Sequence, residues 1–228
     1  MMKTKYSQLM GGLLLALATA GAQAVPLSDL LAGGSITVGD KEFSNWEVVD
    51  ASLNFADPWV LDYTQIDVSG DASDPLDIGL LFDMNGEMSV TGTDFGDFTF
   101  AFDVAVVGAN KIVEVGLELT EYSITDRNDG SVTIAEALDG SALVPDLYVD
   151  TFTGVLSDAT GIAPSSGFRV EKNILLVAGL ADPGGTTNLE TFEQRFKQRA
   201  PALVPEPMTL ALFGLGLAGL GVSRRKAA

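Results

Sequence analysis

The chain has 228 residues, with 13 lysines and arginines against 31 aspartates and glutamates, and it contains no histidine and no cysteine. These absences exclude a Ser-His-Asp triad, histidine or cysteine metal sites, disulfides and thiolate nucleophiles. The net charge of −18 argues against binding to nucleic acid, whose phosphates are recognised mainly by lysine and arginine.

Residues 1–24 have the three parts of a secretory signal peptide. Two lysines precede an apolar run at 9–20, and the segment ends on Ala22-Gln23-Ala24. The small residues Ala22 and Ala24 are typical of a signal cleavage site. The apolar run is shorter than the ~20 residues that span a membrane. We therefore expect export through the secretion translocon, with Val25 as the mature N-terminus.

The body of the chain, residues 25–200, is expected to fold as one acidic domain. Its clearest pattern is at 97–107, where Phe and Val occupy every second position, as in a half-buried β-strand. A second alternating segment, 168–180, is interrupted by Lys172. Both segments predict strands with one face in a core.

Two further segments are less regular. Residues 111–124 alternate from Val113 through Leu119 and then change face at Tyr122, which indicates a β-bulge or a corner. Residues 188–199 fit either a terminal helix or a terminal strand, and we favour the strand because Phe192, Gln194 and Phe196 alternate.

Shorter strands are expected between turn-forming residues such as Gly39-Asp40, Asn85-Gly86 and Asp139-Gly140. They are 35–38, 43–55, 59–68, 76–83, 87–91, 131–138 and 142–152. Many short strands with hardly any helical period predict an all-β antiparallel sandwich of the jelly-roll or lectin-like kind. Trp46 and Trp59 fall in expected strands, where core packing is the more common place for an aromatic ring.

Carboxylates are the most abundant reactive groups. All 31 acidic residues but only eight of the basic ones lie between residues 29 and 206, which gives that part a net charge of −23. Three interpretations remain open: a hydrated acidic surface, calcium binding, and a glycosidase that uses two carboxylates. The candidate calcium ligands are Asp71, Asp74, Asp77, Asp126, Asn128 and Asp129.

These acidic residues do not by themselves indicate catalysis, because so many carboxylates supply candidate pairs by chance. A hairpin turn also accounts for residues 128–130. A sugar site would need aromatic platforms, for which Trp46, Trp59, Tyr63, Tyr122 and Tyr148 are the candidates. We expect no cofactor other than a possible calcium ion, and no enzymatic activity.

The C-terminal segment, 201–228, begins as a proline-containing linker. Pro205-Glu206-Pro207 is expected to be extended, because proline fixes its own φ and restricts the preceding residue. Fifteen uncharged residues at 208–222 then predict a single transmembrane helix, and the basic tail Arg224-Arg225-Lys226 would stay on the cytoplasmic side.

This order of Pro-Glu-Pro, a Gly/Leu-rich helix and a basic tail resembles the PEP-CTERM sorting signal of Gram-negative bacteria. The resemblance implies that a membrane transpeptidase, exosortase, recognises Pro205, Glu206 and Pro207 and processes the tail. A plain membrane anchor is the alternative, but it would not need the Pro-Glu-Pro element.

The stretch from Ser28 to Ser44, with Gly-Gly-Ser-Ile-Thr-Val-Gly-Asp-Lys-Glu-Phe at its centre, is similar to the opening of many PEP-CTERM proteins. The resemblance implies an exported protein of the cell surface or extracellular matrix that accompanies exopolysaccharide. It would be anchored in the inner membrane only in transit. A carbohydrate-binding module, calcium-dependent or not, is the alternative, and a carboxylate glycoside hydrolase is the third interpretation.

Overall fold

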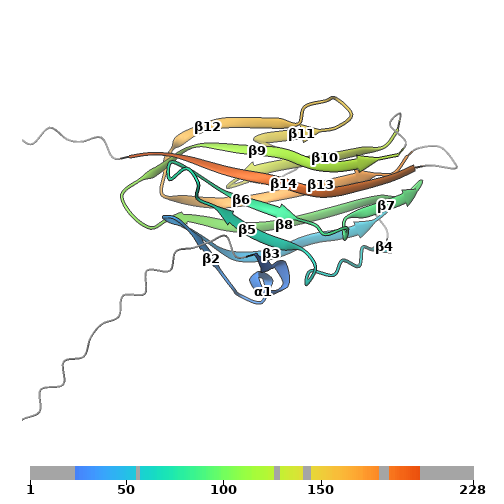
Figure 1. Ribbon diagram of the computed structural model, residues 1–228, viewed down its shortest axis with the longest axis horizontal. Coiled ribbons are helices and arrows are strands. Elements are labelled where there is room, and N and C mark those ends of the chain that lie inside the picture. The colour runs from blue at the N-terminus through green and yellow to red at the C-terminus, as the bar shows by residue number, and fades with distance from the viewer. Residues whose placement is uncertain (1–23, 55–56, 126–128, 141–144, 180–184, 201–228) are drawn as a thin grey trace, which may run out of the picture.

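The computed structural model describes residues 24–54, 57–125, 129–140, 145–179 and 185–200. These residues form two antiparallel β-sheets that pack face to face, which confirms the expected all-β sandwich (Figure 1). Residues 1–23 of the expected signal peptide and the whole of the tail from 201 to 228 lie outside the described residues. Within the described part, no helix is long and apolar enough to cross a membrane.

The first sheet is built around β14, the last strand of the described body. In spatial order it contains β1 (Val25–Pro26), β5 (Asp67–Asp71), β6 (Asp77–Asp83), β14 (Gly185–Arg199), β9 (Lys111–Ile124) and β12 (Ser157–Ser165). A further strand, β7 (Ser89–Gly92), pairs with the beginning of β14. The long strand β14 therefore lies between β6 and β9, and not at an edge.

The second sheet carries the strands that alternate most clearly in the sequence. In spatial order it contains β11 (Leu147–Asp150), β10 (Ser131–Leu138), β13 (Gly167–Val177), β8 (Phe95–Val106), β3 (Lys41–Leu53) and β2 (Ile36–Val38). The short β4 (Asp57–Pro58) pairs with the end of β3. A single turn of helix, α1 (Leu27–Leu31), precedes β2 and buries two leucines in the core.

Aromatic rings from both sheets fill the space between them. Phe82 of β6 lies 5.6 Å from Phe100 of β8, measured between ring centroids, and Phe196 of β14 lies 5.4 Å from Phe43 of β3. The alternation at 97–107 is thereby confirmed, because every second side chain of β8 points into this core. Trp46 is also in the core, as expected.

β14 confirms the strand interpretation of residues 188–199. Its inward positions alternate between aromatic and amide side chains, and all four are buried: Phe192, Gln194, Phe196 and Gln198. Two glutamines thus enter a core that is otherwise largely apolar. Because a buried amide needs hydrogen-bond partners, each of these glutamines must meet other polar groups inside the protein.

The expected change of face in residues 111–124 is present as an irregularity in the pairing of β9 with β14. The register skips Thr120 between the pairs Phe192–Leu119 and Thr191–Glu121, so Tyr122 follows a new parity. A second skip removes Val113 from the pairing. The expectation that Val113 shares the inward face of Leu119 is therefore wrong, and Ile112 is buried in its place.

The expected strand at 59–68 is wrong over most of its length. Asp62 accepts hydrogen bonds from the backbone N–H of Thr64 (3.0 Å) and from its hydroxyl (2.6 Å), and this local turn competes with strand pairing. Strand structure begins only at Asp67. The expected strand at 142–152 is likewise reduced to β11, with residues 141–144 outside the described part.

Four elements of the described residues have no counterpart among the expected segments: the two-residue strands β1 and β4, the strand β12 and the helix α1. β12 is an edge strand, Ser-Asp-Ala-Thr-Gly-Ile-Ala-Pro-Ser, whose side chains are exposed or half-buried throughout, so it has no apolar alternation to detect. The helix α1 has five residues, which is too short to show a helical period.

The strand–turn–strand expected near Gly39-Asp40 is confirmed as the hairpin of β2 and β3. Thr37 pairs with Glu42 and Val38 pairs with Lys41, which leaves a two-residue turn. Gly39 has a φ of +58°, a conformation that favours glycine and suits a tight hairpin. The turn places Asp40 and Lys41 beside Gln198, near the end of β14.

Candidate functional site

The interior of the sandwich contains a closed group of three polar side chains. Lys172 of β13 and Glu136 of β10 are direct cross-strand partners, and Gln194 of β14 faces them from the other sheet. The Lys172 ammonium donates to Glu136 Oε2 and to Gln194 Oε1, and Gln194 Nε2 donates to Glu136 Oε1 at 3.1 Å. All three side chains are 0% exposed.

Burial shifts the pKa values of Lys172 and Glu136 in opposite directions. It lowers the pKa of Lys172 below its ordinary value, although Glu136 opposes the shift. It raises the pKa of Glu136, although Lys172 and Gln194 oppose the shift. Because removal from water disfavours both charges, the two groups are moved toward a neutral amine and a protonated carboxyl.

A second group of the same composition lies at the hairpin turn. Lys41 is fully buried, and its ammonium donates to Gln198 Oε1 at 2.9 Å and to Asp40 Oδ1 at 3.3 Å. Gln198 Nε2 donates back to Asp40 Oδ1 at 3.1 Å and also to the Pro75 carbonyl at 2.6 Å. Burial alone would raise the pKa of Asp40, but hydrogen bonds from Asn110, Lys41 and Gln198 lower it overall.

Sequence reasoning missed both groups, although each left a signal. Lys172 stands at an inward position of an alternating strand, and Gln194 stands between two inward phenylalanines. A charged residue and an amide at inward positions of strands that face each other indicate a buried polar bridge.

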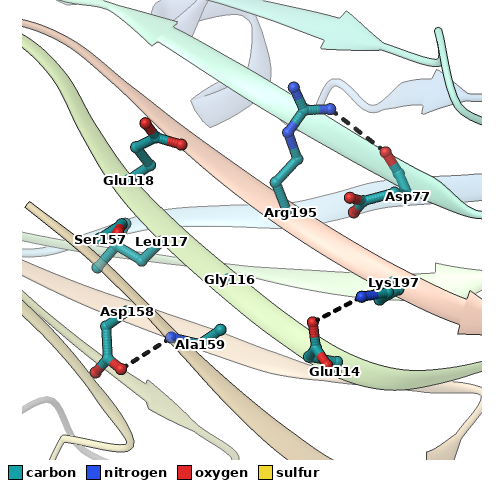
Figure 2. Close-up of a pocket in the computed structure, with 10 residues that line it drawn as sticks. All are labelled: Asp77, Glu114, Gly116, Leu117, Glu118, Ser157, Asp158, Ala159, Arg195 and Lys197. Atoms are coloured by element: carbon teal, nitrogen blue, oxygen red, sulfur yellow. Dashed lines mark hydrogen bonds and ion pairs between the residues drawn. The ribbon is translucent and has the colours of Figure 1, made fainter.

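The outer face of the first sheet is hollowed over β9, β12 and β14 (Figure 2). The hollow has a volume of about 370 Å³ and is lined mostly by charged side chains: Asp77, Glu114, Glu118, Asp158, Arg195 and Lys197. The two cations lie on β14, and the acids come from β6, β9 and β12.

Most of these charged side chains already form ion pairs or hydrogen bonds with neighbouring residues. Arg195 pairs with Asp71 Oδ2 at 2.7 Å and with Glu193 Oε2 at 2.8 Å, and Lys197 pairs with Glu114 at 3.2 Å. The hydrogen bonds to Asp71 and Glu193 raise the pKa of Arg195 in spite of burial, which acts to lower it. Both cations of the hollow are therefore paired, and its four acids outnumber them.

A second hollow, of about 390 Å³, differs in carrying aromatic side chains. It is lined by Tyr122, Ser123, Ile124, Gly130, Thr151 and Phe152. The Phe152 side chain is 69% exposed, whereas Tyr122 packs partly against the core. Phe152 was not among the expected aromatic platforms. Of those that were, Trp46 is buried, while Tyr148 is exposed and donates its hydroxyl proton to Asp150.

The structure does not gather Asp71, Asp74 and Asp77 into one cation site. Asp71 accepts from the Ser73 backbone and pairs with Arg195, and Asp74 accepts from the Leu76 backbone. One oxygen of Asp77 is buried without a hydrogen-bond partner. No cluster of three or more acidic side chains suited to a metal ion occurs among the described residues.

The other expected site residues are largely beyond the described part of the chain. Asp126 and Asn128 lie outside it, whereas Asp129 lies in the turn before β10. The sorting residues Pro205, Glu206, Pro207, Arg224, Arg225 and Lys226 are also outside it, as is Ala22, while Ala24 is the first described residue. Calcium binding by the 126–129 segment stays a prediction.

Comparison with known proteins identifies the tail. The family described as PEP-CTERM protein-sorting motif matches residues 203–226, which include the Pro-Glu-Pro element, the apolar run and the basic tail. The chain carries a PEP-CTERM sorting motif. The PEP-CTERM motif implies an exported protein that is sorted and processed by an exosortase.

No curated protein matches this chain. Among solved structures, it is similar to TmCBM61 in complex with β-1,4-galactotriose, with 10% identity over 68% of this chain and 86% of that one and a TM-score of 0.22. It is also similar to the glycosylation-associated Gap123 complex of Streptococcus agalactiae, with 12% identity, coverages of 73% and 28%, and a TM-score of 0.26.

A third similar structure is a carbohydrate-binding module of the β-sandwich superfamily with promiscuous specificity. It shares 6% identity over 72% of this chain and 58% of its own, with a TM-score of 0.19. All three TM-scores are below 0.5, so these likenesses do not indicate what this chain binds.

Proposed function

We propose that this chain is a structural protein of the cell surface or extracellular matrix, delivered there by exosortase and associated with exopolysaccharide. The observation that carries the proposal is the PEP-CTERM motif at 203–226. The acidic body supports it, because a net charge of −23 between residues 29 and 206 keeps a matrix protein hydrated and soluble.

The proposed route follows from the two ends of the chain. The signal peptide starts export, and the apolar run 208–222 stops in the inner membrane with Arg224, Arg225 and Lys226 on the cytoplasmic side. The exosortase then recognises Pro205-Glu206-Pro207 and releases or transfers the sandwich. The linker after Arg199 gives the enzyme access to this element without unfolding β14.

Replacing Pro205, Glu206 and Pro207 together with alanine tests this route in a producing cell. We expect the variant to keep its tail and to remain in the inner-membrane fraction, while the wild type reaches the surface or the medium. Intact mass and cell fractionation measure the two effects. The matched control, Pro201→Ala, changes a linker proline outside the motif and should be processed normally. Normal tail removal and location in the triple variant would contradict the proposal.

The second hollow favours a second candidate function, carbohydrate binding. An exposed aromatic ring beside hydroxyl-bearing residues suits a sugar, whose apolar ring face stacks on the aromatic while its hydroxyls form hydrogen bonds. Phe152 supplies such a ring, and Ser123 and Thr151 supply hydroxyls. This site would bind without turnover.

Calorimetry of the mature chain with polysaccharide from the producing cells tests this candidate. We expect Phe152→Ala to lose most of the binding, since stacking on the ring is removed. Val60→Ala is the matched control, because Val60 is 89% exposed and lines neither hollow. Loss of binding in EDTA would show that the site also requires calcium. Absence of binding by the wild type would remove this candidate and leave the structural role.

A further inference from the structure

The buried group of Lys172, Glu136 and Gln194 places an amine, a carboxyl and a primary amide in mutual contact. The Lys172 nitrogen reaches the amide oxygen of Gln194, and both the amine and the amide nitrogen are hydrogen-bonded to the Glu136 carboxyl. All three side chains are inside the sandwich, between rows of aromatic and aliphatic side chains. This contact holds the amine next to the amide group that it would attack.

We propose that Lys172 and Gln194 become joined by an isopeptide bond that the folded chain forms by itself, with Glu136 as the acid–base group. Glu136 touches both reacting groups, so it can exchange protons with each. The bond would connect β13 of the second sheet to β14 of the first.

The reaction balances without any co-reactant. The neutral Lys172 amine attacks the side-chain carbonyl carbon of Gln194, and a carbon–nitrogen bond forms. Glu136 takes a proton from the attacking nitrogen and gives its own proton to Gln194 Nε2. The original bond from the carbonyl carbon to Nε2 then breaks, ammonia leaves, and Glu136 is again protonated.

Burial moves the pKa values of Lys172 and Glu136 in the directions that this reaction needs. An ammonium is no nucleophile, but burial lowers the pKa of Lys172, and desolvation is a known way to activate a lysine. The leaving nitrogen needs a proton donor, and burial raises the pKa of Glu136. Water, the competing nucleophile, is excluded because all three side chains have no exposed surface.

The group at the hairpin turn has the same three functional groups but lacks these conditions. The side chain of Asp40 is 23% exposed and its pKa is lowered, so it is a poor proton donor. Gln198 Nε2, which would have to leave, is also held by the Pro75 carbonyl at 2.6 Å. Lys41 and Gln198 therefore serve as an internal control that stays unlinked.

The cross-link would give this chain a covalent tie between sheets although it has no cysteine. It closes a loop from residue 172 to residue 194 and so restricts the unfolded chain in the way that a disulfide does. Such a cross-link suits an exported protein, because neither its formation nor its maintenance requires thiol chemistry.

Mass spectrometry of the full-length chain tests the proposal. We expect an intact mass lower than that of the sequence by one ammonia molecule. Digestion after acidic residues cuts at Glu190 and Glu193, which separates Lys172 from Gln194 in the sequence. A branched peptide containing both residues is the expected product. A digest in which the Lys172 and Gln194 peptides are separate and unmodified would overturn the proposal.

Peptide mapping is needed because the Asn85-Gly86 dipeptide can also lose ammonia, by succinimide formation. Glu136→Gln keeps the shape of the side chain but removes the acid–base group, so it should fold and show no branched peptide. Lys172→Met removes the amine and should also show none, whereas Lys41→Met should retain the link. Circular dichroism verifies that each variant is folded.

Two results in the variants or the mapping would contradict the assignment. A link between Lys172 and Glu136, formed with loss of water, would show that the carboxyl and not the amide is the acyl group. A branched Lys172–Gln194 peptide in Glu136→Gln at the wild-type level would show that Glu136 takes no part.

Discussion

Trp59 packs directly over the backbone of β8 at Gly96. An ideal Cβ built on Gly96 would lie 2.5 Å from Cζ3 of the Trp59 ring, which is closer than real side chains approach. Gly96 has no positive φ, so the requirement for glycine here is one of space and not of backbone conformation. The half-buried ring of Trp59 thus covers one end of the core where the expected strand at 59–68 is missing.

Gly96→Ala should therefore destabilise the sandwich by about 1–3 kcal/mol, the usual range for overpacking. The ring must move toward water, so tryptophan emission should shift to longer wavelength in the folded variant. Denaturant unfolding measures the first effect and fluorescence the second. Gly116→Ala is the matched control, since its Cβ would meet nothing closer than 3.6 Å. Equal stability of the two variants would contradict this account of Trp59.

The strands that sequence analysis located are those with one apolar face. In β8 and β13 apolar residues occupy every second position, apart from Lys172 in β13, so period two identifies both their existence and their inward side. The Gly39-Asp40 turn fixes the β2–β3 hairpin through turn chemistry alone. For these elements local sequence and tertiary packing favour the same structure.

The missed elements have no such local signal. β12 is held at the edge of the first sheet by backbone pairing with β9, which depends on residues 39 to 53 positions earlier. The pairing of β14 with both β6 and β9 is also nonlocal, so sequence alone could not place Gln194 opposite Lys172. Candidate site residues were predictable as residue types, but their grouping depends on this strand order.

At the surface of the molecule, negative charges outnumber positive charges by more than the composition alone indicates. Lys41 and Lys172, two of the eight cations between residues 29 and 206, lie inside the sandwich, and among the described acids only Glu136 is fully buried with them. On the outside, Arg169 and Arg195 each pair with two acids. The remaining surface carboxylates repel one another, and this repulsion acts against the compact state.

Salt should therefore stabilise the mature chain at pH 7. Raising NaCl from about 0.01 M to about 0.15 M shortens the Debye length from roughly 30 Å to roughly 8 Å and screens the repulsion. We expect a gain of about 1 kcal/mol, which corresponds to about 2–4 °C in Tm for a chain of this size. Differential scanning calorimetry measures it, and a Tm that falls with salt would contradict the prediction.

The same measurement tests calcium. CaCl2 and NaCl at equal ionic strength screen the surface to a similar extent, whereas a specific site adds stabilisation that grows with the ratio of free calcium to its dissociation constant. If residues 126–129 bind calcium, Tm should rise further in CaCl2, and Asp129→Asn should remove part of that excess. Asp74→Asn is the control, because Asp74 caps a local turn and should leave the excess unchanged. Equal Tm values in the two salts would mean that the carboxylates act only as a hydrated surface.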